Sequence, residues 1–174
     1  MNYKIYCITG AIFTIILGTV LHFTYDYFQT DFVAIFSAVN ESTWEHLKLI
    51  YFPVTLFAIA EYFIYGKNTE NFFASKVISL LTGMLSIVVI FYTYNGVIGK
   101  SPDWINISIF FVSAATSFIV ETLLFKKENF RCALPRFAFV IICVICVMFI
   151  IFTFITPKIE LFKDPITWVY GLNN

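Results

Sequence analysis

Charged side chains are scarce in this chain, and neither sign of charge prevails. Only 13% of the 174 residues are charged, with 11 Lys and Arg against 11 Asp and Glu, whereas about 25% is usual in soluble domains. The balance excludes a basic field of the kind that holds nucleic acid. Because hydrophobic residues make up 60% of the chain, the shortage of charge indicates an integral membrane protein.

The placement of the cysteines disfavours redox or metal chemistry. The four cysteines are Cys7, Cys132, Cys143 and Cys146, and the last two lie inside an apolar run rather than on a turn. A thiol surrounded by hydrocarbon stays inert. No small-residue cleavage site follows the first apolar run, so we interpret that run as a membrane span rather than a signal peptide.

Long apolar runs fill most of the chain, and a bilayer core needs about 20 apolar residues per helix. Lipid cannot satisfy free backbone groups, so the runs must be helical. We predict an all-α protein, a polytopic five-transmembrane-helix bundle that forms a single domain over residues 1–174. The predicted spans are 5–23, 44–65, 75–94, 104–125 and 136–156, and the polar segment 157–174, with its Trp and Tyr, is predicted to lie in the interface.

Basic residues in the connections predict the orientation of the chain. Their alternation favours a multi-pass protein of the cell membrane with a cytoplasmic N-terminus and an extracytoplasmic C-terminus. Nearly every unusual polar residue then faces the extracytoplasmic side. Seven basic residues fall in the segments that this topology places inside: Lys4, Lys67, Lys76, Lys126, Lys127, Arg131 and Arg136.

The connection between the first two spans carries most of the ionisable side chains near the membrane. An ionisable group inside a span costs about 2.5–3.5 kcal/mol on insertion scales, so such groups indicate a site. His46 lies four residues after Ser42, and Asp26 lies four residues after His22, so each pair shares a helix face. Ligand types that zinc or iron accepts are thereby expected at one depth: His22, Asp26, His46 and either Glu41 or Glu45.

Structural explanations exist for several of these residues. Ser42 and Glu45 match a capping box, which explains both as the start of the second span. The two histidines, each bonded to a carboxylate, would tie the first span to the second without any ligand. Glu61 and Glu121, toward the other ends of spans two and four, are either hydrogen-bonded at the inner interface or part of a proton or ion path.

A family resemblance lies in the first sixty residues. The segments that carry it are LHFTY at 21–25, FSAVNESTWEHLK at 36–48 and YFP at 51–53. With these segments, the chain resembles a family of small bacterial integral membrane proteins that is defined only as a domain of unknown function. This resemblance implies a fold and no activity.

A second, local resemblance concerns zinc. Ser42, Trp44 and His46 fit a short pattern of the membrane hydrolases grouped with alkaline ceramidases and adiponectin-type receptors, where Ser or Asn precedes a zinc-binding His by four residues. That superfamily also uses a second pair of histidines and seven spans, whereas this chain has 2 His and five predicted spans. His22 would have to replace the missing ligands, with help from Asp26, Glu41 or Asp164.

Three functional hypotheses follow. In the first, a metal-dependent hydrolase, a zinc held by His22, His46 and Asp26 activates water for attack on an ester or amide of a lipid-like substrate. Two carboxylates and two polar groups are the catalytic candidates, namely Glu41 and Glu45 to move the proton, and Ser42 and Asn40 to orient the water or the oxyanion. The alternative is small-solute transport, or an accessory subunit working in a homo-oligomer or with a membrane partner. The third hypothesis is a structural clasp without a ligand.

Overall fold

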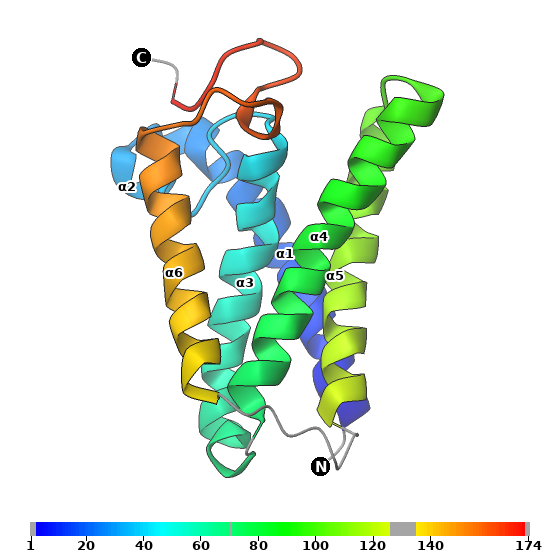
Figure 1. The fold of residues 1–174 in the computed structure, drawn as a ribbon, viewed down its shortest axis with the longest axis vertical. Helices are drawn as coiled ribbons and strands as arrows, with labels where there is room; N and C mark the ends of the chain where they lie inside the picture. Colours follow the sequence, from blue (N-terminus) through cyan, green and yellow to red (C-terminus); the bar gives the residue numbers. More distant parts are fainter. Residues whose placement is uncertain (1–2, 70, 126–134, 173–174) are drawn as a thin grey trace.

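Five long helices run side by side as a bundle in the computed structural model, which describes residues 3–69, 71–125 and 135–172 (Figure 1). All five are long and apolar enough to cross a membrane. The prediction of an all-α bundle with five such helices is therefore confirmed. The helices are α1 (Tyr3–Phe28), α3 (Thr43–Ile64), α4 (Phe72–Ile98), α5 (Asp103–Phe125) and α6 (Pro135–Phe154).

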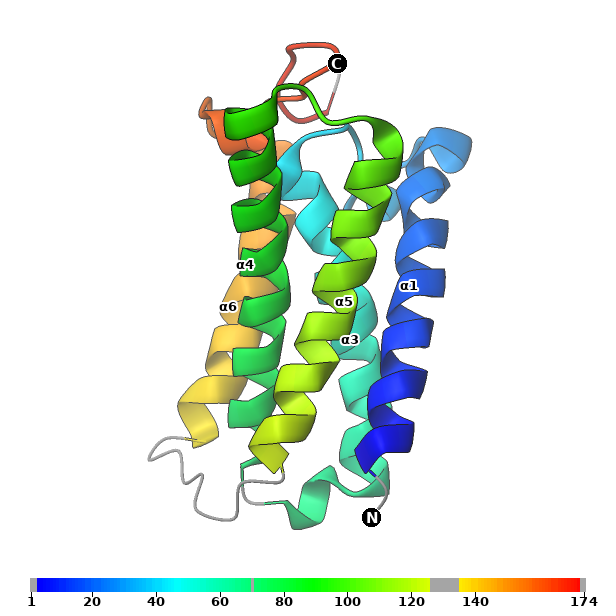
Figure 2. The same cartoon turned by 90° about the vertical axis from the view of Figure 1, so that its right-hand side faces the viewer.

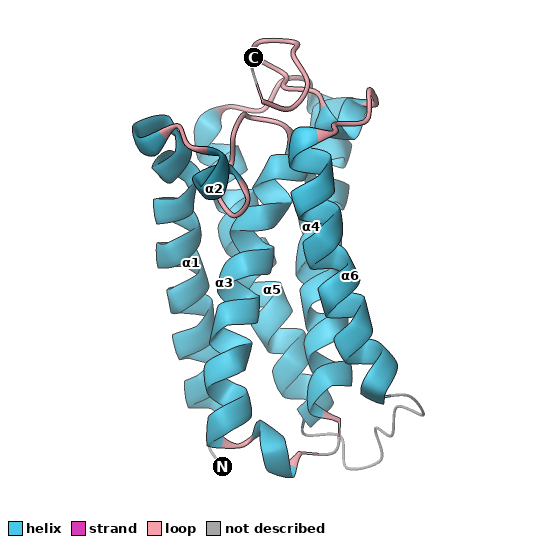
Figure 3. Ribbon diagram, turned by 90° about the vertical axis from the view of Figure 1, so that its left-hand side faces the viewer, coloured by secondary structure: helices cyan, strands magenta, loops and turns pink. Residues whose placement is uncertain are grey.

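The two ends of the bundle differ in chemistry, and we name them by their residues. The histidine end, where α1 and α6 finish and α3 begins, carries His22 and His46; the lysine end, where α1, α4 and α6 begin, carries Lys76. In Figure 2, α5 lies between α4 and α1, and α6 packs against α4. Figure 3 shows that loop segments of the described residues gather at the histidine end.

Three short helical segments join or follow the long helices: α2 (Asp31–Ala34), η1 (Gly66–Asn68) and η2 (Glu160–Phe162). The segment carrying η2 folds over the start of α3, because the Phe162 ring lies 4.6 Å from the Trp44 ring. Trp44 in turn contacts Phe149 of α6 at 4.7 Å between ring centroids. The part of the predicted interfacial segment that is described thus packs on the bundle through an aromatic anchor.

Helix ends depart from the predicted spans where polar residues continue a helix beyond its apolar core. We predicted that the third span ends at 94, yet α4 runs to Ile98, because Asn95 bonds its own helix and Gly99, with φ 101°, stops it. The first span was predicted to end at 23, and α1 continues to Phe28 before Gln29 takes a φ of 47°. Apolar runs therefore locate the helices, and left-handed residues such as these end them.

Pro53 lies inside α3 without interrupting it. Its missing N–H frees the carbonyl of Leu49, and a Cβ placed on Gly18 of α1 would lie 2.6 Å from that oxygen. Since a glycine lets another backbone approach closely, α1 packs against α3 at the turn that the proline opens.

The position of Lys76 weakens part of the basis for the predicted orientation, which counts basic residues in the connections. The predicted orientation counted Lys76 with the basic residues of the connections, although the predicted span 75–94 contains it; it lies in the second turn of α4 and is 2% exposed. Lys126, Lys127 and Arg131, which also entered that count, lie outside the described residues, as does Cys132. Which side of the membrane each end faces therefore remains a prediction.

We predict that Gly18→Ala lowers the free energy of unfolding by about 1–3 kcal/mol, the usual range for overpacking a close contact. Gly96→Ala is the matched control, because a Cβ there meets nothing within 4 Å and alanine favours a helix. Thermal unfolding in detergent measures both. Equal melting of Gly18→Ala and the wild type would contradict the close approach of α1 to α3.

Candidate functional site

Two imidazoles and a carboxylate meet at the histidine end. His22 of α1 and His46 of α3 have ring centroids 5.2 Å apart. Glu41, in the connection before α3, has one carboxylate oxygen 3.5 Å from Nε2 of His46 and the other 3.8 Å from Nε2 of His22. Each residue offers one ligand atom, and these atoms all lie within 4.8 Å of one another. Three chain segments thus bring together a possible set of metal ligands.

The tautomer of His46 follows from its backbone contact. Its Nδ1 lies 2.9 Å from the carbonyl oxygen of Ser42, which can only accept, so Nδ1 carries the hydrogen. In the neutral ring the lone pair is then on Nε2, the atom that faces Glu41. A metal-binding histidine is usually fixed in this way, by a hydrogen bond from its other nitrogen.

Asn40 and Ser42 fix the connection on either side of Glu41. The side chain of Asn40 accepts from the Ser42 amide at 2.9 Å and donates to the Gly171 carbonyl at 2.9 Å. The hydroxyl of Ser42 accepts from the Glu45 amide at 3.4 Å and caps α3. Both residues, which we predicted to orient a water or an oxyanion, bond to the backbone in this structure.

Glu45 points away from the histidines and pairs with Lys48. Its Oε2 accepts from Nζ of Lys48 at 2.6 Å and from the amide of Val39 at 3.1 Å. Lys48 also donates to the Ala34 carbonyl at 2.9 Å. The capping box is therefore only half formed, since the Ser42 amide is taken by Asn40 and Glu45 binds Val39 instead. Sequence reasoning missed this pair because it explained Glu45 as part of a capping box.

Two predicted carboxylates lie outside the histidine group. Asp26, one helical turn beyond His22, is not among the three residues that meet there. Asp164 uses one carboxylate oxygen to accept from the Ile166 amide at 2.7 Å and the other to accept from the Thr167 hydroxyl at 2.8 Å. Glu41, which we predicted both as a possible ligand and as a group that moves a proton, is the carboxylate that lies beside the two histidines.

A second cluster of charge lies at the lysine end. The ammonium of Lys76 pairs with Glu61 of α3 and with Glu121 of α5. Sequence reasoning singled out both carboxylates but missed their common partner, since a lysine near the edge of an apolar run was counted as a loop residue. Tyr65, just after α3, donates to Glu61 at 2.7 Å.

Comparison with known proteins places the chain in a family. The model of a family described as "Family of unknown function (DUF6512)" matches residues 1–172, and the chain belongs to this family. No match was found among curated proteins or among solved structures. The resemblance to a family of unknown function is thus supported over nearly the whole chain, whereas neither the motif at 36–48 nor the local likeness to the ceramidase group is confirmed.

We predict that Glu45→Gln and Lys48→Met each lower the free energy of unfolding by about 3–5 kcal/mol, because each leaves a buried charge without its partner. The double variant should cost less than the sum of the two, since it removes both charges. Unfolding of the four proteins in detergent gives the coupling energy. Additive losses would show that the two side chains do not interact.

Proposed function

We propose that this member of the DUF6512 family binds a divalent transition metal, zinc first among them, at the extracytoplasmic face of the cell membrane. His22, Glu41 and His46 are the proposed ligands. The observation that carries this proposal is the meeting of three ligand atoms, from three segments, within 4.8 Å of one another.

The spacing of these atoms favours a metal over a clasp. The Nε2 to oxygen distances of 3.5 and 3.8 Å exceed the 2.7–3.2 Å of an N–H···O hydrogen bond. Two ligand atoms that each lie about 2.1 Å from a tetrahedral ion are roughly 3.4 Å apart. Glu41 therefore stands too far from the histidines to bond them directly and at a suitable distance to share an ion with them.

The number and exposure of the ligands favour an open coordination position. Three protein ligands are the usual number in catalytic zinc sites, where water occupies the fourth place. The side chains of His22, Glu41 and His46 are 28%, 42% and 26% exposed, so solvent or a substrate group can approach the ion.

We further propose hydrolysis of a lipid-like ester or amide as the reaction. A zinc-bound water ionises near pH 7 and can attack a carbonyl carbon, and a site at the end of the spans lies at the depth of lipid headgroups. Glu45 is held by Lys48, so the role left to it is to position the connection. Glu41 acts as a ligand, and Ser42 orients His46 through its carbonyl.

Metal binding is tested on protein purified in detergent, stripped with a chelator and titrated with zinc by calorimetry, with metal analysis after dialysis. We expect the wild type to take up one ion per chain and His22→Ala, Glu41→Gln and His46→Ala to bind at least about tenfold more weakly, since even outer partners of a metal contribute 10–100-fold. Asp26→Asn is the matched control and should bind like the wild type.

Two results would oppose the proposal at different levels. Zinc uptake that is unchanged in all three ligand variants, or no uptake by the wild type, would contradict the metal site. Normal uptake without zinc-dependent cleavage of fluorogenic phospholipid or ceramide analogues would leave the metal site standing and contradict hydrolysis.

A further inference from the structure

At the lysine end, two carboxylates share one ammonium. Nζ of Lys76 contacts Oε2 of Glu61 and lies 2.5 Å from Oε1 of Glu121. The three side chains are 2%, 2% and 4% exposed, and they come from α4, α3 and α5 respectively. The cluster therefore lies within the membrane bundle, away from water.

The two carboxylates are not equivalent. Glu61 uses both oxygens, since Oε1 accepts from the Tyr65 hydroxyl at 2.7 Å and Oε2 accepts from Lys76. Glu121 uses Oε1 for Lys76, while its Oε2 is buried and has no hydrogen-bond partner among the described residues. Hydrogen-bond donors that point at a carboxylate stabilise its charged form. A negative charge is therefore more stable on Glu61 than on Glu121.

The charge of the cluster does not balance when every group is ionised. Two carboxylates and one ammonium leave one net negative charge, and a buried charge without a partner is costly in a low-dielectric interior. Tyr65 offers a hydrogen bond and no positive charge, and Tyr6 of α1 packs on Tyr65 with ring centroids 5.0 Å apart. One proton on a carboxylate restores neutrality.

We infer that Glu121 is a proton-binding site, with Lys76 and Glu61 as the ion pair that holds it in place. The proton resides on the carboxyl group of Glu121, whose Oε2 is, among the described residues, the one oxygen of the two carboxylates without a donor. The site is separate from the proposed metal site and does not depend on it.

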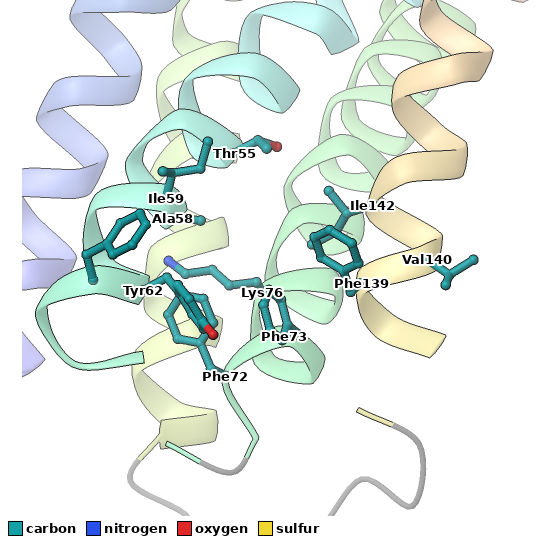
Figure 4. A pocket seen from close by; sticks show the side chains of 11 residues that line it. Thr55, Ala58, Ile59, Tyr62, Phe72, Phe73, Lys76, Phe139, Val140 and Ile142 are labelled. Atoms are coloured by element: carbon teal, nitrogen blue, oxygen red, sulfur yellow. The ribbon is translucent and has the colours of Figure 1, made fainter. Parts of the chain in front are cut away.

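A cavity of about 840 Å³ reaches this cluster from between α3, α4 and α6 (Figure 4). Among the described residues of its wall, Lys76 is the one that carries a charge, and the others are mainly aromatic and aliphatic side chains such as Tyr62, Phe73 and Phe139. Figure 4 shows the nitrogen of Lys76 turned away from α6. Lys76 thus borders the cavity and, through its ammonium, contacts both carboxylates.

Infrared spectroscopy of the wild type in lipid tests the inference directly. We expect the C=O band of a protonated carboxylic acid at neutral pH, which shifts in heavy water, disappears as the pH rises and is absent from Glu121→Gln. Glu160→Gln is the control, because that side chain is 77% exposed and should leave the band unchanged. A wild type without such a band, or a band that persists in Glu121→Gln, would overturn the inference.

Stability distinguishes the two carboxylates. Glutamine copies the shape of a neutral acid, so Glu121→Gln should unfold near the wild-type temperature, whereas Glu61→Gln should unfold well below it. Because the folded protein holds a proton that the unfolded chain releases, wild-type stability should fall as the pH rises, and Glu121→Gln should lack this dependence. An equal loss of stability in both variants, or pH dependence retained in Glu121→Gln, would show that the proton is not on Glu121.

Discussion

The ion pair of Glu45 and Lys48 is the interaction on which the histidine end depends. Both side chains are almost fully buried, and in such surroundings each needs the other as well as backbone partners. Lys48 donates to Ala34, and Glu45 accepts from Val39, so the pair fastens the connection to α3. Glu41 lies in the same connection, two residues after Val39. The Glu45–Lys48 pair, together with the backbone bonds of Asn40 and Ser42, therefore holds the segment that carries Glu41 beside the two histidines.

The two polar clusters follow different physical rules. Around Glu41, the side chains of His22 and His46 are partly exposed and lie farther from the carboxylate than a hydrogen bond allows. At the lysine end, the side chains of Lys76, Glu61 and Glu121 are buried and in direct contact. One ammonium there faces two carboxylates, so one negative charge has no positive partner within the cluster. His46 and Glu61 are separated on α3 by about 22 Å at 1.5 Å per residue. The proposed metal site and the proposed proton site thus lie near opposite ends of the bundle, and we expect them to act independently.

Much of the fold was predictable because the bilayer leaves few alternatives. Apolar runs gave all five long helices, and the cap at Ser42 gave the start of α3. The partners of the charged residues were not predictable. A capping box and a buried ion pair use the same glutamate, so Glu45 could not be assigned, and Lys76 could not be told from a loop lysine. The choice of Glu41 over Asp26 beside the histidines depends on how α1 approaches α3, which local spacing does not encode.

The central claim is that His22, Glu41 and His46 surround a metal ion. X-ray absorption spectroscopy of the zinc-loaded protein tests it most directly, because it reports the atoms bound to the ion. The account predicts two imidazole nitrogens, a carboxylate oxygen and a water-derived oxygen at about 2.0–2.2 Å. A zinc surrounded only by oxygens, or by any sulfur, would contradict it.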